Sequence, residues 1–477
     1  MTDATELWQF TLVEIGERIA SGEVSPVEVT RACLARTGRL GPALNATTTI
    51  LADQALEAAR QAEREIVGGT HRGPLHGVPI GIKDLADVAG APTTAGSHVF
   101  DGHIAERDST LVRQLKRAGA VIIAKLNCDE MALHPTGAIS QFGPGLNPWN
   151  TSRVSGGSSS GSGIAVAAGM MFAALGSDTG GSIRMPAAAC GVVGIKPTYG
   201  RVSLDGVRQL APTFDTPGPM ARTTLDAALM LRAMVDPDDE ARIGVSNSLT
   251  HLVPDADAGL DGLRLGVPSS YFFEEIDPEI ERIARGAIDA LARLGAELVA
   301  VELSSLPQVI ESHWGIMILE AHASISAATG GDLSRVGEAL RERLAAGLEV
   351  LNLDPRDTAA TLGRLRAMRD DALADYRRAT SQVNALVVPA LPRSPVPIAQ
   401  ALTDFTWMGR FTRCFNCTHE PVVCLPCGRG SDGMPVGLQI VAPKYRERTA
   451  VRIALAYERG GDAPALGWPP EPDLPAN

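Results

Sequence analysis

The chain has 477 residues, of which 45% are apolar, 21% are charged and 4% are aromatic, and its formal net charge is −12. The apolar content is ample for a folded core. The acidic balance, without any basic run, argues against a nucleic-acid partner, because such partners need a cationic face. The N-terminal stretch MTDATELWQF has no basic segment followed by an apolar one, and no apolar run reaches the roughly 18 residues that span a bilayer. We therefore expect a soluble, cytoplasmic protein that does not associate with membranes.

The N-terminal part of the chain is expected to be helical. The sequence Ser-Pro-Val-Glu at Ser25–Glu28 is a capping box with proline at the first helical position, and it predicts a helix to about Thr37. Residues 51–66, LADQALEAARQAEREI, form a second amphipathic stretch. We interpret residues 1–65 as a helical N-terminal region.

Beyond this region the pattern changes to strands that alternate with helices. Short apolar runs bounded by glycine are typical of strands that are buried on both faces. The order strand, helix, strand is expected twice, over residues 77–84, 108–119 and 119–125 and over residues 262–268, 277–294 and 296–303. A further strand is expected at 385–390. This alternation predicts an α/β fold.

The chain shows no internal repeat and no break in composition, so we expect one large domain over residues 1–477. Residues 306–378 are almost entirely helix-forming and are interpreted as a helical insertion. The expected core with the active site spans 66–260, and the second part of the sheet spans 261–460. A proline-rich tail follows at 461–477.

The seven cysteines are an odd number in a chain without an export signal, so a disulfide framework is not expected. Four of them form two CxxC pairs, Cys414 with Cys417 and Cys424 with Cys427, a pattern that can hold zinc. The connector THEPVV is shorter than in a zinc ribbon, and neither pair has the glycine that lets it turn. We expect four buried free thiols and no metal.

Two stretches rich in serine and glycine are candidates for the functional site. Residues 153–169, RVSGGSSSGSGIAVAAG, have the composition of a flexible linker, but they lie inside the α/β region, which disfavours that interpretation. Residues 173–191, AALGSDTGGSIRMPAAACG, predict a strand, a tight turn, Ser182 and then a helix. This geometry presents a hydroxyl beside free backbone N–H groups, which can form an oxyanion hole. A plain glycine turn is the alternative for this second stretch.

A nucleophilic serine needs a base, which is usually histidine. None of the nine histidines lies in a recognisable partner motif. Lys83 ends the apolar strand GVPIGIK, where burial would favour the neutral amine that can act as the base. The alternative is a lysine at the end of a strand that reaches solvent. The combination of motifs decides between these interpretations.

That combination resembles the amidase signature family, which comprises hydrolases and transamidases of carboxamides with a Ser–cis-Ser–Lys triad. It consists of the strand that ends in Lys83, the later Gly-Gly-Ser-Ser loop, and the segment Asp-Thr-Gly-Gly-Ser-Ile-Arg. Similar segments occur over most of the chain, among them KLNCDEMAL, FGPGLNPWN, GIKPTYGRVS, DTPGPMART and GMPVGLQIVAP. The resemblance implies a single domain with a central, mixed, twisted sheet covered by helices on both faces.

The resemblance also implies a role for each matching residue. Lys83 corresponds to the catalytic lysine and Ser182 to the serine that is acylated. Ser158 corresponds to the bridging serine, and its peptide bond with Gly157 is expected to be cis. Because three serines are adjacent here, Ser159 is the alternative for this bridging role.

Further residues are implied to support the triad. Thr179, Gly180 and Gly181, together with the nucleophile, are expected to form the oxyanion hole with their backbone N–H groups. Asp178 and Arg184 look like the pair that braces this turn, without a direct part in the chemistry. The resemblance implies no cofactor and no metal.

In this family the segment after KLN lines the acyl pocket, which here contains Ala132, Leu133 and His134. The segment has no arginine to bind a free carboxylate, so we expect apolar or aryl amides, with esters and carbamates (urethanes) as further candidates. The expected enzyme is a free-standing serine amidohydrolase of linear amide C–N bonds, such as an aryl acylamidase or a urethanase. Its expected partner is this small molecule, with no nucleic acid, and a homodimer is left open.

Two alternatives are kept beside this prediction. The first is the A subunit of a glutamine-dependent tRNA amidotransferase, which would require partner subunits and an ammonia channel. The second, from another class, is an inactive scaffold or binding protein. It is disfavoured because Lys83, Ser158 and Ser182 are all present.

Overall fold

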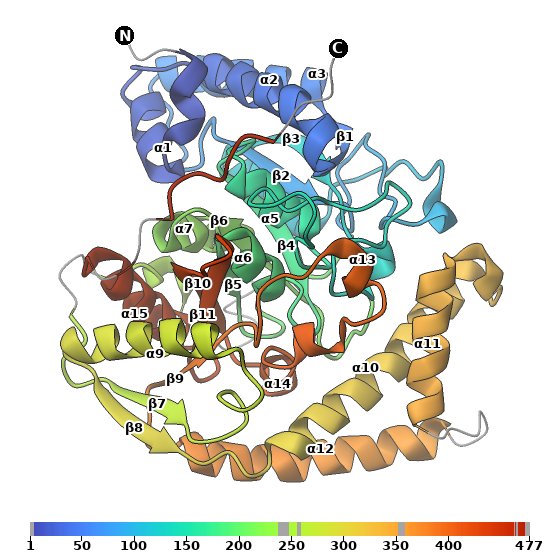
Figure 1. The fold of residues 1–477 in the computed structure, drawn as a ribbon. Helices are drawn as coiled ribbons and strands as arrows, with labels where there is room; N and C mark the ends of the chain where they lie inside the picture. Colours follow the sequence, from blue (N-terminus) through green and yellow to red (C-terminus); the bar gives the residue numbers. More distant parts are fainter. Residues whose placement is uncertain are drawn as a thin grey trace.

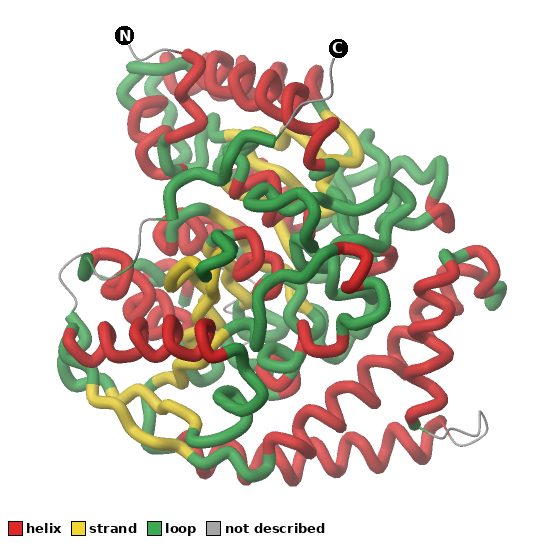
Figure 2. The backbone as a smooth tube through the Cα atoms, viewed as in Figure 1, coloured by secondary structure: helices red, strands yellow, loops and turns green. Residues whose placement is uncertain are grey.

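The computed structural model describes residues 4–236, 248–254, 259–351, 358–461, 463 and 466–472. Eleven strands form one mixed sheet, and helices cover both of its faces (Figures 1 and 2). This architecture confirms the predicted α/β class. Among the described residues, no helix is long and apolar enough to cross a membrane.

The strands follow one another across the sheet in the order β1-β3-β2-β4-β6-β5-β10-β11-β9-β7-β8. Strand β2 is parallel to β3 and β4, and β7 is parallel to β8 and β9, whereas the other neighbours are antiparallel. The bounds of the strands are β1 Thr47–Ile50, β2 Pro79–Lys83, β3 Val121–Leu126, β4 Ala173–Asp178, β5 Val193–Lys196, β6 Thr216–Ala221, β7 Arg264–Pro268, β8 Glu297–Val301, β9 Ala385–Pro389, β10 Val422–Arg429 and β11 Pro435–Val441.

The helices are distributed along the whole chain. Their bounds are α1 Leu12–Ala20, α2 Pro26–Leu44, α3 Ala52–Val67, α4 Thr110–Arg117, α5 Ser160–Ala167, α6 Arg184–Cys190, α7 Thr224–Met234, α9 Pro278–Arg293, α10 Leu306–Thr329, α11 Glu338–Val350, α12 Thr358–Thr380, α13 Ile398–Ala401, α14 Cys414–Cys417 and α15 Glu447–Arg459.

Helix α2 shows how local sequence and packing combine. It begins at the predicted capping box, in which the Ser25 side chain accepts from the backbone and the Glu28 carboxylate accepts from the Ser25 N–H. It then continues beyond the predicted end at Thr37, although Gly38, Gly41 and Pro42 follow. Leu40 and Leu44 are buried in the core, so tertiary packing outweighs the weak helix propensity of this last part.

Strand β2 places Lys83 at the centre of the fold. All five of its residues are buried, which agrees with the apolar run in the sequence. The strand lies between β3 and β4 and is parallel to both, so the carboxyl ends of the three strands lie at the same edge of this part of the sheet. In open α/β sheets, ligands bind outside the carboxyl ends of such strands.

Helices α10, α11 and α12 occupy the stretch that was predicted to be a helical insertion. Helix α10 packs against α11, α12 and α14, and the three long helices lie together to one side of the sheet (Figure 1). Their apolar faces belong to a second hydrophobic cluster, separate from the main core. The finer division of the domain stays a prediction. Of the expected tail, residues 462, 464, 465 and 473–477 lie outside the described part of the chain.

Candidate active site

The side chains singled out by the sequence meet at the carboxyl ends of β2 and β4. Lys83 is the last residue of β2, and Ser177 and Asp178 end the neighbouring strand β4. Ser158 lies just before α5, and Ser182 lies just before α6. The exposed fraction is 1% for Lys83, 0% for Ser158 and 6% for Ser182, so bulk water has little access to these groups.

The amine of Lys83 donates to two hydroxyl groups. Its Nζ atom lies 2.8 Å from Ser158 Oγ and 2.9 Å from Ser177 Oγ. Burial lowers the pKa of Lys83 to about 8, because the ammonium form loses its hydration, although Asp129 and Asp178 act in the opposite direction. A substantial fraction of the amine is therefore neutral near neutral pH. Ser177 is a contact that the sequence analysis did not identify.

The glycine-serine loop has tight steric requirements. The peptide bond between Gly157 and Ser158 is cis, as the resemblance implies. A Cβ atom on Gly157 would lie 1.9 Å from Asp129 Oδ2, so only glycine fits at this position. Ser159 has a different task from Ser158, because its hydroxyl bridges the carbonyl and the N–H of Ser177 at 3.1 Å each. Of the two serines, Ser158 is the one in contact with the lysine.

An ion pair holds the turn that carries Ser182. Arg184 and Asp178 are fully buried and form a bidentate pair, with distances of 2.9 and 3.0 Å. Burial opposes ionisation of Asp178, but the adjacent guanidinium holds the pKa of this carboxyl well below its usual range. Arg184 also donates to the carbonyl of Thr412 and to the side chains of Gln439 and Asn416. The predicted bracing pair is thus tied to the opposite part of the fold.

The backbone of the turn points its N–H groups in two directions. The Gly181 N–H donates to Asp178 Oδ1 at 2.7 Å, so this group serves the brace, and its expected place in the oxyanion hole is corrected. Among the described residues, no acceptor engages the N–H groups of Thr179, Gly180 or Ser182. These three groups are the free donors beside the Ser182 hydroxyl.

Contacts from distant segments fix the orientation of this backbone. His313, on α10, lies with Nε2 2.9 Å from the carbonyl oxygen of Thr179. Burial lowers the pKa of His313 to about 3, so the ring is neutral, and Nε2 must carry the proton that it donates to the carbonyl. The Thr412 hydroxyl donates to the carbonyl of Gly180 at 2.6 Å, and Asp215 accepts from the Thr179 hydroxyl at 2.6 Å. The sequence analysis missed these three residues.

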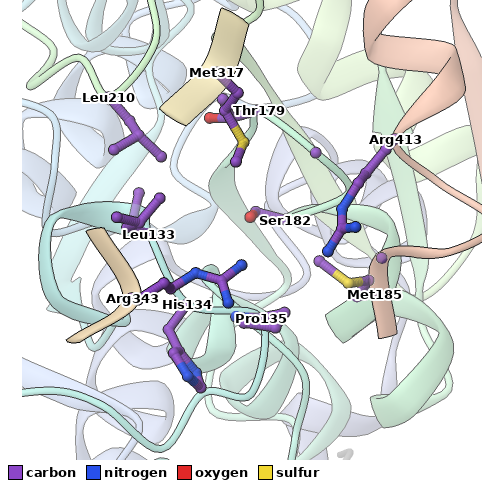
Figure 3. A pocket seen from close by; sticks show the side chains of 13 residues that line it. Leu133, His134, Pro135, Thr179, Ser182, Met185, Leu210, Met317, Arg343 and Arg413 are labelled. Carbon is purple, nitrogen blue, oxygen red and sulfur yellow. The ribbon is translucent and has the colours of Figure 1, made fainter. Parts of the chain in front are cut away.

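A small pocket opens in front of Ser182 (Figure 3). Ala132, Leu133 and His134 line it, in the place where the sequence analysis expected them. The ring of His134 turns away from the nucleophile, packs on Phe405 with 4.3 Å between the centroids, and hydrogen-bonds with Thr136. Burial lowers the pKa of His134 to about 3, so it is neutral and contributes shape more than charge.

Two arginines complete the pocket, contrary to the prediction of an apolar site. Arg343 comes from α11, and Arg413 precedes α14. Figure 3 shows their guanidinium groups entering from opposite sides of the pocket, with the Ser182 hydroxyl between them. Neither arginine lies in the segment after KLN, and α11 carries no motif, so the sequence offers no signal for their convergence.

The four clustered cysteines lie on two different elements. Cys414 and Cys417 form the ends of α14, whereas Cys424 and Cys427 lie on β10. All four are buried free thiols, and they are divided between the two hydrophobic clusters. Within the described ranges, no group of three or more His, Cys, Asp or Glu residues is arranged to hold a metal ion.

The fold and this constellation define an amidase. The chain matches the amidase family over residues 28–451 and belongs to that family. It is therefore a hydrolase of the amidase type, which acts on C–N bonds. The expected family membership is confirmed.

Particular relatives cover almost the whole chain. The A subunit of the glutamyl-tRNA(Gln) amidotransferase of Myxococcus xanthus is 38% identical over 96% of this chain and 98% of its own length. The solved structure of the A subunit of the glutamyl-tRNA(Gln) amidotransferase from Thermotoga maritima has a TM-score of 0.82 and 27% identity, and the match covers 100% of this chain and 99% of that one. A structure from a vestigial protein complex, described with the origins of an s-triazine catabolic enzyme, has a TM-score of 0.86 at 31% identity over 95% of this chain and 99% of that one.

These relatives correct two predictions. A free-standing amidase for apolar or aryl amides, esters or carbamates is wrong, because the full-length relative bears the name of one subunit of an amidotransferase. The arginines beside Ser182 contradict the stated reason for that prediction, namely the absence of a carboxylate-binding group. The expectation of a small molecule alone, without nucleic acid or a different partner protein, is wrong for the same reason, because the relatives are named as one subunit of an enzyme of a tRNA.

Proposed function

We propose that this chain is the amide-hydrolysing A subunit of an amidotransferase of the glutamyl-tRNA(Gln) type. In this role it releases ammonia from the amide group of a donor that bears a carboxylate. Similarity to subunits of that name over nearly the full length supports the role. The single structural observation that carries it is the pair of guanidinium groups beside the Ser182 hydroxyl, because they provide the binding group that a carboxylate-bearing amide needs.

Lys83, Ser158 and Ser182 would form the proton path of the acylation step. Neutral Lys83 accepts the proton of Ser158, and Ser158 accepts the proton of Ser182 as the Ser182 oxygen attacks the amide carbon. The 2.8 Å contact between Lys83 and Ser158 supports the first transfer. When the tetrahedral intermediate collapses, the C–N bond breaks, and the proton returns along the same path to the departing nitrogen. Ammonia leaves, and the acyl group stays on Ser182 as an ester.

Water then completes the cycle. It attacks the ester carbon, gives its proton to the same serine-lysine pair, and the Ser182 oxygen leaves with a proton. In both steps negative charge develops on the carbonyl oxygen of the substrate. The free N–H groups of Thr179 and Gly180 are the proposed donors to this oxygen. Their carbonyl groups are held by His313 and Thr412, so the donors are oriented before the substrate arrives.

The transfer half of the reaction requires other subunits. The residues described above account for hydrolysis of an amide and release of ammonia, whereas the relatives are named for a complete amidotransferase of which they form one subunit. We therefore expect this chain to act with partner subunits that bind the tRNA and receive the ammonia.

An assay of released ammonia tests this function. The purified chain, alone and with the partner subunits of its own organism, is given L-glutamine, glutaramate, p-nitroacetanilide and a phenyl carbamate. We expect ammonia from at least one of the two carboxylate-bearing amides, no turnover of the two aryl compounds, and amidation of glutamyl-tRNA only with the partners. Turnover of the aryl compounds without any release of ammonia would overturn the proposal.

A further inference from the structure

The guanidinium groups of Arg343 and Arg413 have no counter-ion in the protein. No described carboxylate or carbonyl group accepts a hydrogen bond from either side chain, and the Nε atom of Arg343 is buried without a partner. Both guanidinium groups lie near the ring of Trp314, with Cζ 5.3 and 5.1 Å from its centroid. Other buried arginines of this chain are paired, as the Arg184–Asp178 ion pair shows. Unpaired cations in a pocket indicate an anionic ligand.

No described residue that lines the pocket carries a carboxylate. The buried carboxylates nearby are already engaged: Asp129 accepts from the N–H groups of Gly137 and Ile139, and Asp215 accepts from the hydroxyl of Thr179. Burial and the charge of Arg413 lower the pKa of Arg343 to about 9, so both arginines remain protonated at neutral pH. The pocket is thus cationic, in a chain with a net charge of −12.

This charge pattern discriminates between possible donors. A carboxylate gains from either guanidinium, whereas an ammonium group in the same small pocket meets two like charges and no acceptor carboxylate. Glutamine carries both groups on its α-carbon. The monoamide of a dicarboxylic acid, such as glutaramate or succinamate, carries only the carboxylate.

We propose that the pocket selects an amide with an anionic far end and no ammonium group, the monoamide of a dicarboxylic acid, over glutamine. This inference rests on the proposed amide hydrolysis at Ser182 and narrows its substrate. Arg343 and Arg413 are the residues that determine this specificity.

Gly409 gives Arg413 its place in the pocket. A Cβ atom on Gly409 would lie 2.7 Å from Nε and 3.0 Å from Cζ of Arg413, so a side chain at this position would displace or engage the guanidinium. The φ angle of Gly409 is not in the left-handed region, so other residues can adopt its backbone conformation. Gly409→Asp would therefore place a carboxylate against Arg413 and provide an acceptor for an ammonium group, and Gly409→Ala is its uncharged control.

The experiment measures kcat/KM for ammonia release from glutaramate, succinamate, L-glutamine and uncharged valeramide. For the unmodified protein we expect glutaramate or succinamate to exceed both glutamine and valeramide by about tenfold or more. Arg413→Gln and Arg343→Gln should each reduce this preference, mainly through KM. Arg343→Lys keeps the charge and should restore part of it. Arg410→Gln, in the same segment but paired with Glu275 outside the pocket, should leave the preference unchanged.

Gly409→Asp should shift the preference toward glutamine, and Gly409→Ala should not. Equal or better turnover of glutamine by the unmodified protein would overturn this inference and leave the proposed function intact. A preference for the dicarboxylate monoamides that is unchanged in both arginine variants, with native circular dichroism, would also overturn it. If none of the four amides releases ammonia while Ser182→Ala and the unmodified protein behave alike, the proposed function itself fails.

Discussion

Lys83 Nζ lies 2.8 Å from Ser158 Oγ, in a position from which bulk solvent is excluded. No described carboxylate forms an ion pair with this lysine, so nothing nearby compensates the charge of its ammonium form directly. This relationship makes the amine a weak acid, with a pKa of about 8, and puts it in contact with the hydroxyl that can pass protons to it. The base, the relay and the nucleophile are carried by β2, by the loop before α5 and by the turn before α6.

The activity should rise with pH as Lys83 loses its proton. Since its pKa is lowered to about 8, the neutral and active form increases as the pH passes from 7 to 9. At pH 7 about a tenth of the lysine is neutral. Ammonia release measured from pH 6 to 9.5 should follow this titration. Lys83→Ala and Lys83→Arg should be inactive over the whole range, because arginine keeps its proton there. An active Lys83→Arg protein at pH 7 would require another base.

Ser158 and Ser159 should differ strongly in their effect on turnover. Ser158→Ala removes the contact with Lys83, and proton transfer of this kind typically contributes a factor of about 10²–10⁴ in rate. Ser159→Ala removes two hydrogen bonds to Ser177 and should reduce stability more than it reduces kcat. Single-turnover rates and thermal unfolding of both variants measure the two effects. A crippled Ser159→Ala protein beside a nearly normal Ser158→Ala protein would assign the relay to Ser159.

His313 should act on the oxyanion donors as a positioning residue. Its Nε2–H holds the carbonyl of Thr179, so His313→Ala should lower kcat by about tenfold or more and change KM little, because the loss is felt mainly in the transition state. His313→Gln can still donate to this carbonyl and should recover part of the rate. His322→Ala, on the same helix, is the matched control. A change in KM alone would contradict this role.

Removal of metal ions should leave the activity unchanged. The four clustered cysteines lie on α14 and β10, in two different hydrophobic clusters, and burial raises the pKa of Cys417 to about 11 and that of Cys424 to about 12. Protonated thiols divided in this way do not form a zinc site. Elemental analysis should find less than one zinc per chain, and ammonia release should survive prolonged treatment with a chelator. Tightly held, stoichiometric zinc would show that this interpretation is wrong.

Local patterns in the sequence were sufficient for the parts of the site that lie on continuous motifs. The apolar run before Lys83 predicted a buried strand, and the strand is β2. The Asp-Thr-Gly-Gly-Ser segment predicted a turn between a strand and a helix, which lies between β4 and α6. These features depend on neighbouring residues, so periodicity and turn chemistry were informative.

The remaining parts of the site depend on packing between distant segments. Arg343 lies on an amphipathic helix among glutamate, alanine and leucine, where arginine is an ordinary surface residue. Only the packing of α11 and α14 around α10 brings Arg343 and Arg413 to the same pocket. His313 is likewise one residue of a long helix, and its contact with Thr179 spans 134 positions in the chain. No periodicity in a single sequence reports such a contact.

Mass spectrometry of the trapped acyl-enzyme tests the central claim most directly. The protein is mixed with the carboxylate-bearing amide that it hydrolyses fastest, quenched in acid within one turnover, digested and analysed for modified peptides. The account predicts that the peptide containing Ser182 gains the mass of the substrate minus ammonia, and that Ser182→Ala, with native circular dichroism, shows no such gain. An acyl group on another residue, or a gain that persists in Ser182→Ala, would contradict it.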